Sequence, residues 1–228
     1  AEIDPNFCTG CSVCAQVCKF DAIVNSARNG KLKENIDMKT INILLAGVGG
    51  QGVLLASKIL SEAALVQGLD IKQSEVHGMS QRGGSVVSHV RIGEKVHSPL
   101  VPDGSCDILV GFEPLEGLRH SHNVAPEGTL VYALDRINPS TVSAGFAEYP
   151  ADIEEQLKAL PIKTIGVPAA KYAEEAGTRR AANVVLVGVM SNLFDFKTDV
   201  WEKALKASIP AKVLDTNIKA FELGRKHI

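Results

Sequence analysis

The chain has 228 residues, of which 45% are hydrophobic, and its 24 basic and 26 acidic residues leave a net charge of −2. This length supports one sizeable core, or one domain with a small appendage. The balanced charge predicts no nucleic-acid face and no membrane-attracted patch. No apolar run reaches the roughly 18 residues that a membrane span needs. The N-terminus lacks signal-peptide character, so we expect a cytoplasmic protein.

Four of the five cysteines form a C-x2-C-x2-C-x3-C run at Cys8, Cys11, Cys14 and Cys18. Thiolates at these spacings wrap a small iron–sulfur cage, so the run predicts ligands of a 4Fe-4S cluster. Zinc is the alternative, but zinc sites commonly use two separated ligand pairs. A disulfide framework would spread its cysteines along the chain.

The fourth cysteine of this pattern characteristically binds a second cluster when two are present. Residues 1–25 are therefore predicted to be half of a two-cluster ferredoxin-like domain whose other half lies upstream. Lys19 replaces the proline that usually follows, without removing a ligand. Residues 26–37 are polar and lack apolar periodicity, as in a linker or a chain junction. Met38 directly precedes the first strand, so our hypothesis is that two polypeptides are joined here; a gene fusion is the alternative.

From Ile41 onward, strand patterns alternate with helix patterns. In chain order we expect a strand from 41 into a glycine turn, a helix at 53–68, a strand at 70–76, a β-hairpin of 85–93 with 95–101, a strand at 106–112, a helix at 114–122, strands at 128–134 and 162–167, and helices at 180–194, 198–209 and 213–228. This order predicts an α/β fold over residues 38–228, with a doubly wound, mostly parallel, Rossmann-like sheet. The hairpin predicts an antiparallel excursion at one edge.

The first candidate ligand site is the segment GVGGQG, which matches G-x-G-x-x-G between a predicted strand and helix. Backbone N–H groups at a helix start bind anions, so the segment predicts a phosphate site for a dinucleotide or coenzyme A. Its candidate residues are Gly47, Gly49, Gly50, Gln51 and Gly52. Alternatively, the glycines only permit a tight turn against a partner. An NAD site needs an acidic residue after the next strand, near which Glu75 stands.

A second loop, EVHGMSQRGG, is rich in residues with special properties. His77 titrates near neutral pH, and Arg82 offers a planar fork for phosphate or carboxylate. The candidate binding residues here are His77, Ser80, Gln81, Arg82, Gly83 and Gly84. The alternative is a structured loop in which Arg82 only pairs with a carboxylate. His89, His97 and Cys106 are expected to be structural.

Together these residues resemble a known family. The segments ILLAGVGGQGVLLASKIL, EVHGMSQRGGSVVSHVRIG and AANVVLVGVMSNLF are similar to the gamma-type domain of 2-oxoacid:ferredoxin oxidoreductases, and within it to small (beta) subunits acting on indolepyruvate. The resemblance covers about residues 38–228. The cysteine segment resembles the end of the large (alpha) subunit of such enzymes.

The resemblance implies an enzyme that is active only as a complex, a heterotetramer with the large subunit. That subunit would hold thiamine diphosphate with Mg2+, and an arylpyruvate would yield aryl-acetyl-CoA and CO2. Electrons would pass through 4Fe-4S clusters at the four cysteines to ferredoxin, and coenzyme A would take the acyl group. The glycine loop and Arg82 would lie near the active site or coenzyme A, and no catalytic residue is assigned to this chain.

Two other functions remain open from the sequence. A non-catalytic electron-transfer or scaffold subunit would carry the cluster without affecting arylpyruvate turnover. An NAD-dependent oxidoreductase would bind nicotinamide, but it leaves the S-Q-R-G-G loop and the cysteines unexplained.

Overall fold

The computed structural model describes residues 40–77, 83–138 and 140–228. The chain divides into two units, residues 1–38 and 39–228, and all described residues belong to the second. The predicted ferredoxin-like half at 1–25 and the predicted linker at 26–37 lie outside the described residues. The fold below is that of the second unit.

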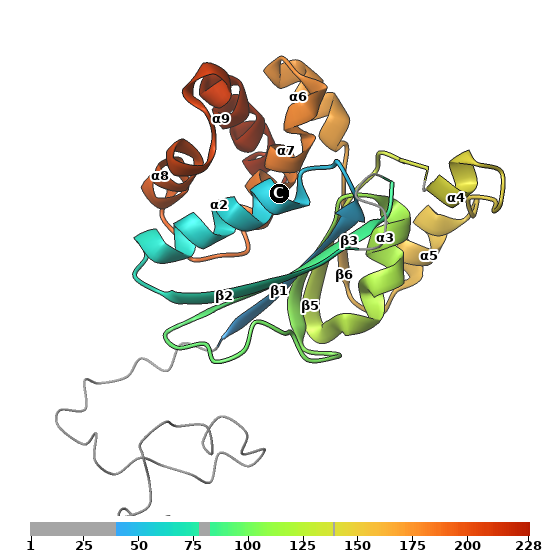
Figure 1. Cartoon of the computed structure of the whole chain (residues 1–228), viewed down its shortest axis with the longest axis horizontal. Helices are drawn as coiled ribbons and strands as arrows, with labels where there is room; N and C mark the ends of the chain where they lie inside the picture. Colours follow the sequence, from blue (N-terminus) through green and yellow to red (C-terminus); the bar gives the residue numbers. More distant parts are fainter. Residues whose placement is uncertain (1–39, 78–82, 139) are drawn as a thin grey trace, which may run out of the picture. The chain divides into compact units, whose positions relative to one another are not determined.

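A six-stranded mixed sheet forms the centre of this unit (Figure 1). Its strands are β1 (Ile41–Val48), β2 (Asp70–His77), β3 (Ser85–Gly93), β4 (Cys106–Gly111), β5 (Val124–Ala133) and β6 (Lys163–Val167). Their order is β2-β3-β1-β4-β5-β6, with β1, β4, β5 and β6 parallel. Residues 42–48 of β1 are all buried, as expected for a central strand covered on both faces.

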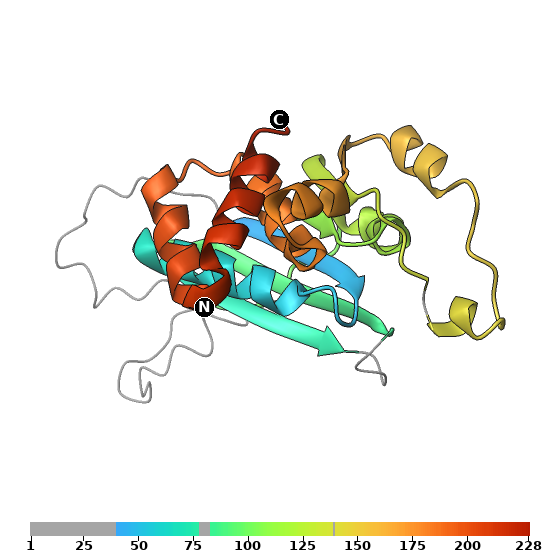
Figure 2. The same cartoon turned by 90° about the horizontal axis from the view of Figure 1, so that it is seen from above.

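Helices cover both faces of the sheet (Figures 1 and 2). One face packs against α2 (Val53–Val66), α6 (Ala169–Ala176), α7 (Ala182–Ser191), α8 (Thr198–Ser208) and α9 (Ala211–Arg225). The other packs against α3 (Pro114–His120) and α5 (Ile153–Ala159). Short elements are η2 (Ser121–Asn123), α4 (Ser140–Ser143) and η3 (Arg179–Ala181). The predicted doubly wound α/β architecture is confirmed, whereas the short helices α5 and α6 were not predicted.

The antiparallel excursion lies at the predicted edge, but its partners differ from the prediction. Residues 95–101 form no strand, so the hairpin of 85–93 with 95–101 is wrong. β3 instead pairs antiparallel with both β2 and β1. Side chains satisfy the backbone of the 95–101 segment: Val96 N donates to Asp70 Oδ2 (2.9 Å) and Val101 N to His89 Nδ1 (3.2 Å). Pro99, which has no N–H, would also interrupt a ladder.

The helix α7 is apolar nearly all round and lies in the core, as predicted, although it begins at Ala182 because η3 precedes it. Gly188 of α7 and Gly224 of α9 allow these two helices to approach closely. Trp201 of α8 is fully buried, with its ring against those of Phe194, Phe196 and Phe221. These contacts hold the C-terminal helices as one layer over the sheet.

Candidate functional site

The glycine turn joins β1 to α2, as the sequence predicts. Gly50 and Gly52 have φ values of 103° and 80°, in the left-handed region that favours glycine. Gly52 is the N-cap of α2, and no side chain caps this helix. Within the described ranges, the N–H groups of Gly50 and Gly52 form no hydrogen bond. The turn therefore offers free donors at the positive end of a 14-residue helix.

The Gln51 side chain holds this turn against the end of β4. Its Oε1 accepts from Val48 N (2.7 Å), and its Nε2 donates to Phe112 O (2.6 Å). Gly47 permits the same close approach, because a Cβ there would lie 2.8 Å from the Phe112 Cβ. Both polar atoms of the Gln51 side-chain amide thus form hydrogen bonds within this chain. Gln51 would therefore assist ligand binding by positioning the turn.

The two loops singled out from the sequence meet at their backbones. Gly49 N donates to Gly84 O (2.8 Å), and Gly83 N reaches Gly49 O at 3.5 Å. Both glycine segments thus border one region. Ser80, Gln81 and Arg82 lie outside the described residues, as does the His77 side chain. Their predicted binding roles stay predictions.

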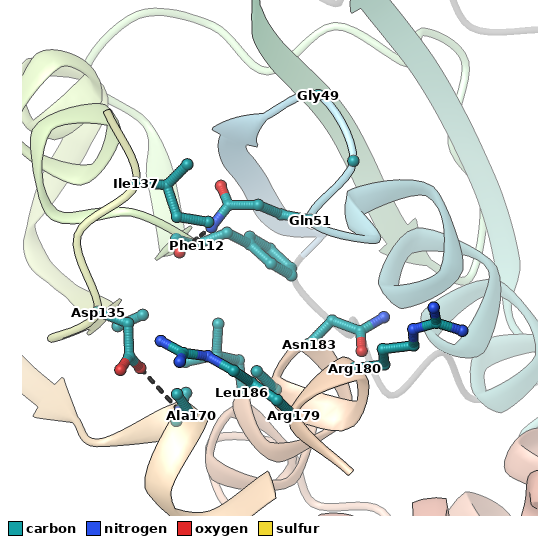
Figure 3. A pocket seen from close by; sticks show the side chains of 14 residues that line it. Gly49, Gln51, Phe112, Asp135, Ile137, Ala170, Arg179, Arg180, Asn183 and Leu186 are labelled. Carbon is teal, nitrogen blue, oxygen red and sulfur yellow. Dashed lines mark hydrogen bonds between the residues drawn. The ribbon is translucent and has the colours of Figure 1, made fainter. Parts of the chain in front are cut away.

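The glycine turn lies at the topological switch point of the sheet. From β1 the sheet continues through β3 and β2, whereas from β4 it continues the other way through β5 and β6. Ligands of open α/β sheets bind at the carboxyl ends of the strands at such a point. A cavity of about 350 Å³ lies there (Figure 3), and we call it the switch-point pocket. Its lining residues are Gly49, Gly50, Gln51, Phe112, Ala133, Asp135, Ile137, Ala169, Ala170, Arg179, Arg180, Ala182, Asn183 and Leu186.

Asn183 is the most informative polar residue of the pocket. It is only 5% exposed, and its Nδ2 donates to Gly52 O (3.2 Å). Its Oδ1 is buried and has no hydrogen-bond partner in the described part of the chain. A buried acceptor without a donor costs stability, so an occupant carrying an N–H or O–H group would relieve that cost.

Charged groups stand around the same pocket. Asp135 Oδ2 accepts from Ala170 N (2.7 Å) at the start of α6. Arg179 is 71% exposed and forms only a 3.7 Å surface pair with Glu174. In Figure 3 the guanidinium groups of Arg179 and Arg180 point in opposite directions, Arg180 toward α2. Sequence reasoning missed these residues and Asn183; the available signals were an acid directly after a strand and a pair of arginines before a helix.

Glu75 does not line the pocket, and this weighs against the NAD alternative. In a dinucleotide fold the acidic residue ends a strand beside the glycine-bearing strand. Here β3 lies between β1 and β2, so β2 and its Glu75 are two strand spacings away. The glycine motif is present without its expected acidic partner.

A buried polar cluster supports the segment that follows β5. Glu113 is fully buried and caps α3 by accepting from Leu115 N (2.8 Å) and Glu116 N (3.2 Å). Tyr149 donates its hydroxyl to Glu113 (2.5 Å), and the Arg136 guanidinium stacks 3.7 Å from the Tyr149 ring centroid. Burial raises the pKa of the Glu113 carboxyl, although these donors oppose the rise.

Cys106 is a core residue, as predicted. It is fully buried, its Sγ donates to Ile108 O (3.1 Å), and burial raises the pKa of its thiol to about 12. In residues 40–77, 83–138 and 140–228 no three His, Cys, Asp or Glu side chains form a group that would hold a metal ion. Nor does that part of the chain include a helix long and apolar enough to cross a membrane. The predicted cluster ligands Cys8, Cys11, Cys14 and Cys18 lie outside it.

Fold and site together define a class: an open α/β domain with a ligand pocket at the switch point and a glycine turn facing it. The chain belongs to the pyruvate ferredoxin/flavodoxin oxidoreductase family, whose sequence pattern matches residues 42–227. Residues 1–24 match a 4Fe-4S binding domain. The predicted relation to ferredoxin oxidoreductases, and the iron–sulfur nature of the cysteine segment, are confirmed.

Among the proteins similar to this chain are two indolepyruvate oxidoreductase subunits and one gamma subunit of known structure. The chain is 42% identical over 196 residues to the indolepyruvate oxidoreductase subunit IorB of Thermococcus kodakarensis, covering 83% of this chain and 96% of that protein. It is 41% identical to the same-named subunit of Pyrococcus horikoshii, with the same coverage. The structure resembles the gamma subunit of a keto/oxoacid ferredoxin oxidoreductase from Geobacter sulfurreducens, with a TM-score of 0.62, 25% identity, and coverage of 82% of this chain and 97% of that one.

Proposed function

We propose that this chain is the small-subunit component of an arylpyruvate:ferredoxin oxidoreductase whose preferred substrate is indolepyruvate. The observation that carries the proposal is the 42% identity to an indolepyruvate oxidoreductase subunit across 96% of its length. The reaction joins an arylpyruvate and coenzyme A to give aryl-acetyl-CoA and CO2, and two electrons pass singly to ferredoxin.

The partner is a large subunit, in a heterotetramer of two copies of each. The described part of this chain holds no metal-binding group, and its pocket presents free N–H donors and arginines but no acid–base pair beside a nucleophile. Thiamine diphosphate with Mg2+, held mainly by the large subunit, supplies the chemistry that cleaves the bond to the departing carboxylate. This chain contributes binding and position.

The cysteine segment serves electron transfer. Cys8, Cys11, Cys14 and Cys18 have the ligand type and spacing that iron–sulfur clusters require, and residues 1–24 match a cluster-binding domain. A 4Fe-4S cluster there would accept and release single electrons between the oxidised substrate and ferredoxin.

The two glycine loops form the candidate surface for coenzyme A. The contacts of Gly49 with Gly83 and Gly84 support this, because the two glycines that end the S-Q-R-G-G segment lie beside the free N–H donors of the glycine turn. Arg82 would complete the surface with a planar cation suited to phosphate.

The test is to purify the native complex without oxygen and to assay 2-oxoacid-dependent reduction of ferredoxin. Indolepyruvate is expected to give the highest kcat/KM, with phenylpyruvate close and 2-oxoglutarate at least about tenfold lower. Arg82→Ala is expected to raise the KM for coenzyme A. Equal turnover of 2-oxoglutarate, or turnover that does not depend on coenzyme A, would contradict the proposal.

The same preparation tests the proposed chain junction. Denaturing mass spectrometry of every co-eluting chain is expected to show one species that begins near Met38 beside a much larger one. A single species carrying both the cysteine run and the α/β domain would overturn the junction, and would favour an electron-carrier subunit.

A further inference from the structure

The connection between β5 and α5, residues 134–152, projects from the body of the α/β unit, and we call it the arm. Its described residues include the short helix α4 and no strand. None of their side chains is buried, and all except Asp135, Val142 and Tyr149 are exposed. In Figures 1 and 2 the yellow helix α4 stands apart from the sheet and from the C-terminal helices. The arm leaves the sheet at the carboxyl end of β5, the edge at which open α/β domains bind ligands.

Specific contacts hold the two ends of the arm. The Arg136 guanidinium stacks 3.7 Å from the centroid of the Tyr149 ring. The Tyr149 hydroxyl donates to the buried Glu113 (2.5 Å), and the backbone of Ile137 donates to the same carboxylate. Both ends of the arm are therefore attached to the residue that follows β4, and the segment between them projects from a defined base.

The backbone at the tip of the arm is hydrogen-bonded as well, because α4 ends in a Schellman motif. Gly145 has a φ of 77°, and its N–H donates to Val142 O (3.0 Å). The Phe146 N–H donates to Thr141 O (2.9 Å). An apolar side chain at the Phe146 position of this motif frequently packs against the helix.

The Phe146 side chain instead points into solvent. It is 86% exposed, whereas the next most exposed large apolar side chain of the described residues, Leu65, is 58% exposed. Single exposed apolar side chains are common, but here the fold fixes the backbone and leaves an aromatic ring uncovered. Aromatic side chains of this kind are the usual anchors of protein–protein interfaces.

The arm and the first turn of α5 carry an excess of acidic charge. The exposed carboxylates are those of Glu148, Asp152, Glu154 and Glu155. Arg136 is the one basic residue of the arm, and it stacks on Tyr149. An aromatic anchor accompanied by carboxylates fits an apolar socket that has basic side chains at its rim.

We propose that the arm is a docking surface for the large subunit, and that Phe146 anchors it in an apolar socket with a basic rim. The inference rests on the proposed function, in which a large subunit is the partner. The arm projects from the ligand-binding edge of the sheet, where a subunit that shares the reaction would approach. A second copy of this chain fits less well, because two arms meeting about a twofold axis would bring their acidic groups together.

The test places the photoreactive p-benzoylphenylalanine at position 146 and irradiates the native complex, purified without oxygen. Mass spectrometry of the cross-linked peptides is expected to join position 146 to the large subunit. The same replacement of Leu100 is the control, since that side chain is 55% exposed but precedes β4, at the opposite edge of the sheet. The control should give no cross-link to the same peptide of the large subunit.

A second measurement tests how much the ring contributes to the complex. Phe146→Ala is expected to raise the dissociation constant about 10- to 100-fold, as for an interface hot spot, and Phe146→Leu to raise it less. Mass photometry during dilution of the native complex measures these constants. Because the ring is exposed, Phe146→Ala should keep the thermal midpoint of the wild type. Leu100→Ala should leave the dissociation constant within about twofold.

Charge reversal tests the basic rim. Glu148→Lys/Glu155→Lys is expected to weaken the complex at low ionic strength and to have a smaller effect in about 0.5 M salt. Glu94→Lys/Glu127→Lys makes the same change of charge at two exposed positions at the opposite edge of the sheet, and should have little effect. Equal weakening by the two pairs would overturn the basic rim.

The outcomes separate this inference from the proposed function. A cross-link to a second copy of this chain, or to ferredoxin, overturns the choice of partner and leaves the proposed function intact. No cross-link from position 146, or an unchanged dissociation constant in Phe146→Ala, overturns the docking role and also leaves that function intact. If no large subunit co-purifies with this chain, the proposed function fails together with this inference.

Discussion

Glu113 shows how one buried side chain couples stability to pH. In the unfolded chain its carboxyl would have the ordinary pKa of 4.5, and burial raises the pKa in the folded protein. Between these two values the folded state binds more protons than the unfolded state. The contribution of Glu113 to the free energy of unfolding therefore falls as the pH rises from about 4.5 through the raised folded pKa.

We expect Glu113→Gln to remove this dependence, because the amide stays neutral and still accepts from the start of α3. Urea unfolding from about pH 4 to about pH 8 should show the wild type losing stability relative to the variant as pH rises. The exposed Glu127→Gln is the control. A stability difference between wild type and Glu113→Gln that is constant across this range would contradict the assignment.

At the scale of elements, the packing of α7 on α9 depends on two glycines. A Cβ at Gly188 would overlap the Phe221 carbonyl oxygen, and a Cβ at Gly224 would overlap that of Val185. These neighbours are backbone atoms, so a rotamer change cannot relieve the clash. The position of α7 matters to the site as well, because its first turn carries Asn183.

Gly188→Ala is accordingly expected to lower the free energy of unfolding by about 1–3 kcal/mol, the usual cost of overpacking a core. The matched control is Gly117→Ala in α3, where a Cβ would meet its nearest atom at 3.5 Å, an ordinary contact. Helix propensity favours that control by up to about 1 kcal/mol. Chemical denaturation measures both, and equal effects of the two substitutions would refute this account of the helix contact.

At the scale of the molecule, the α/β unit contains its own core. Both buried apolar clusters consist of residues from Ile43 to Phe221, all within the described ranges. Helices of the same unit cover each face of the sheet. Folding of this unit is not expected to require a bound cluster.

Replacing Cys8, Cys11, Cys14 and Cys18 together by serine should abolish iron and sulfide content but leave the thermal midpoint of the α/β unit within about 2 °C, as for changes outside a core. Iron analysis and calorimetry on the same sample measure both. Cys106→Ala is the control, since that thiol is buried in the core: it should lower the midpoint and leave iron unchanged. Loss of the α/β transition in the serine variant would show that the two units depend on each other.

From the amino-acid sequence alone we predicted the alternation of strands and helices, the strand–turn–helix at the glycines, and the burial of α7. These features are local: apolar periodicity and glycine conformation depend on neighbours within a few residues. The G-x-G-G-Q-G and S-Q-R-G-G segments likewise identified the family, because their spacing is specific. The short helices α5 and α6 were not predicted, because a helix of seven or eight residues shows little apolar periodicity.

The pairing of the strands and the set of residues that share the pocket became evident only from the fold. The sequence of residues 95–101 predicts a strand. In the structure, however, the side chains of Asp70 and His89 accept hydrogen bonds from the backbone of this segment, and β3 pairs with β2 instead. In the sequence Asn183 is one polar residue of an apolar helix. The fold brings it to Gly52, 131 positions earlier in the chain, and leaves its Oδ1 without a hydrogen-bond partner among the described residues. Such long-range contacts arise from the packing of whole elements, so no local pattern in the chain predicts them.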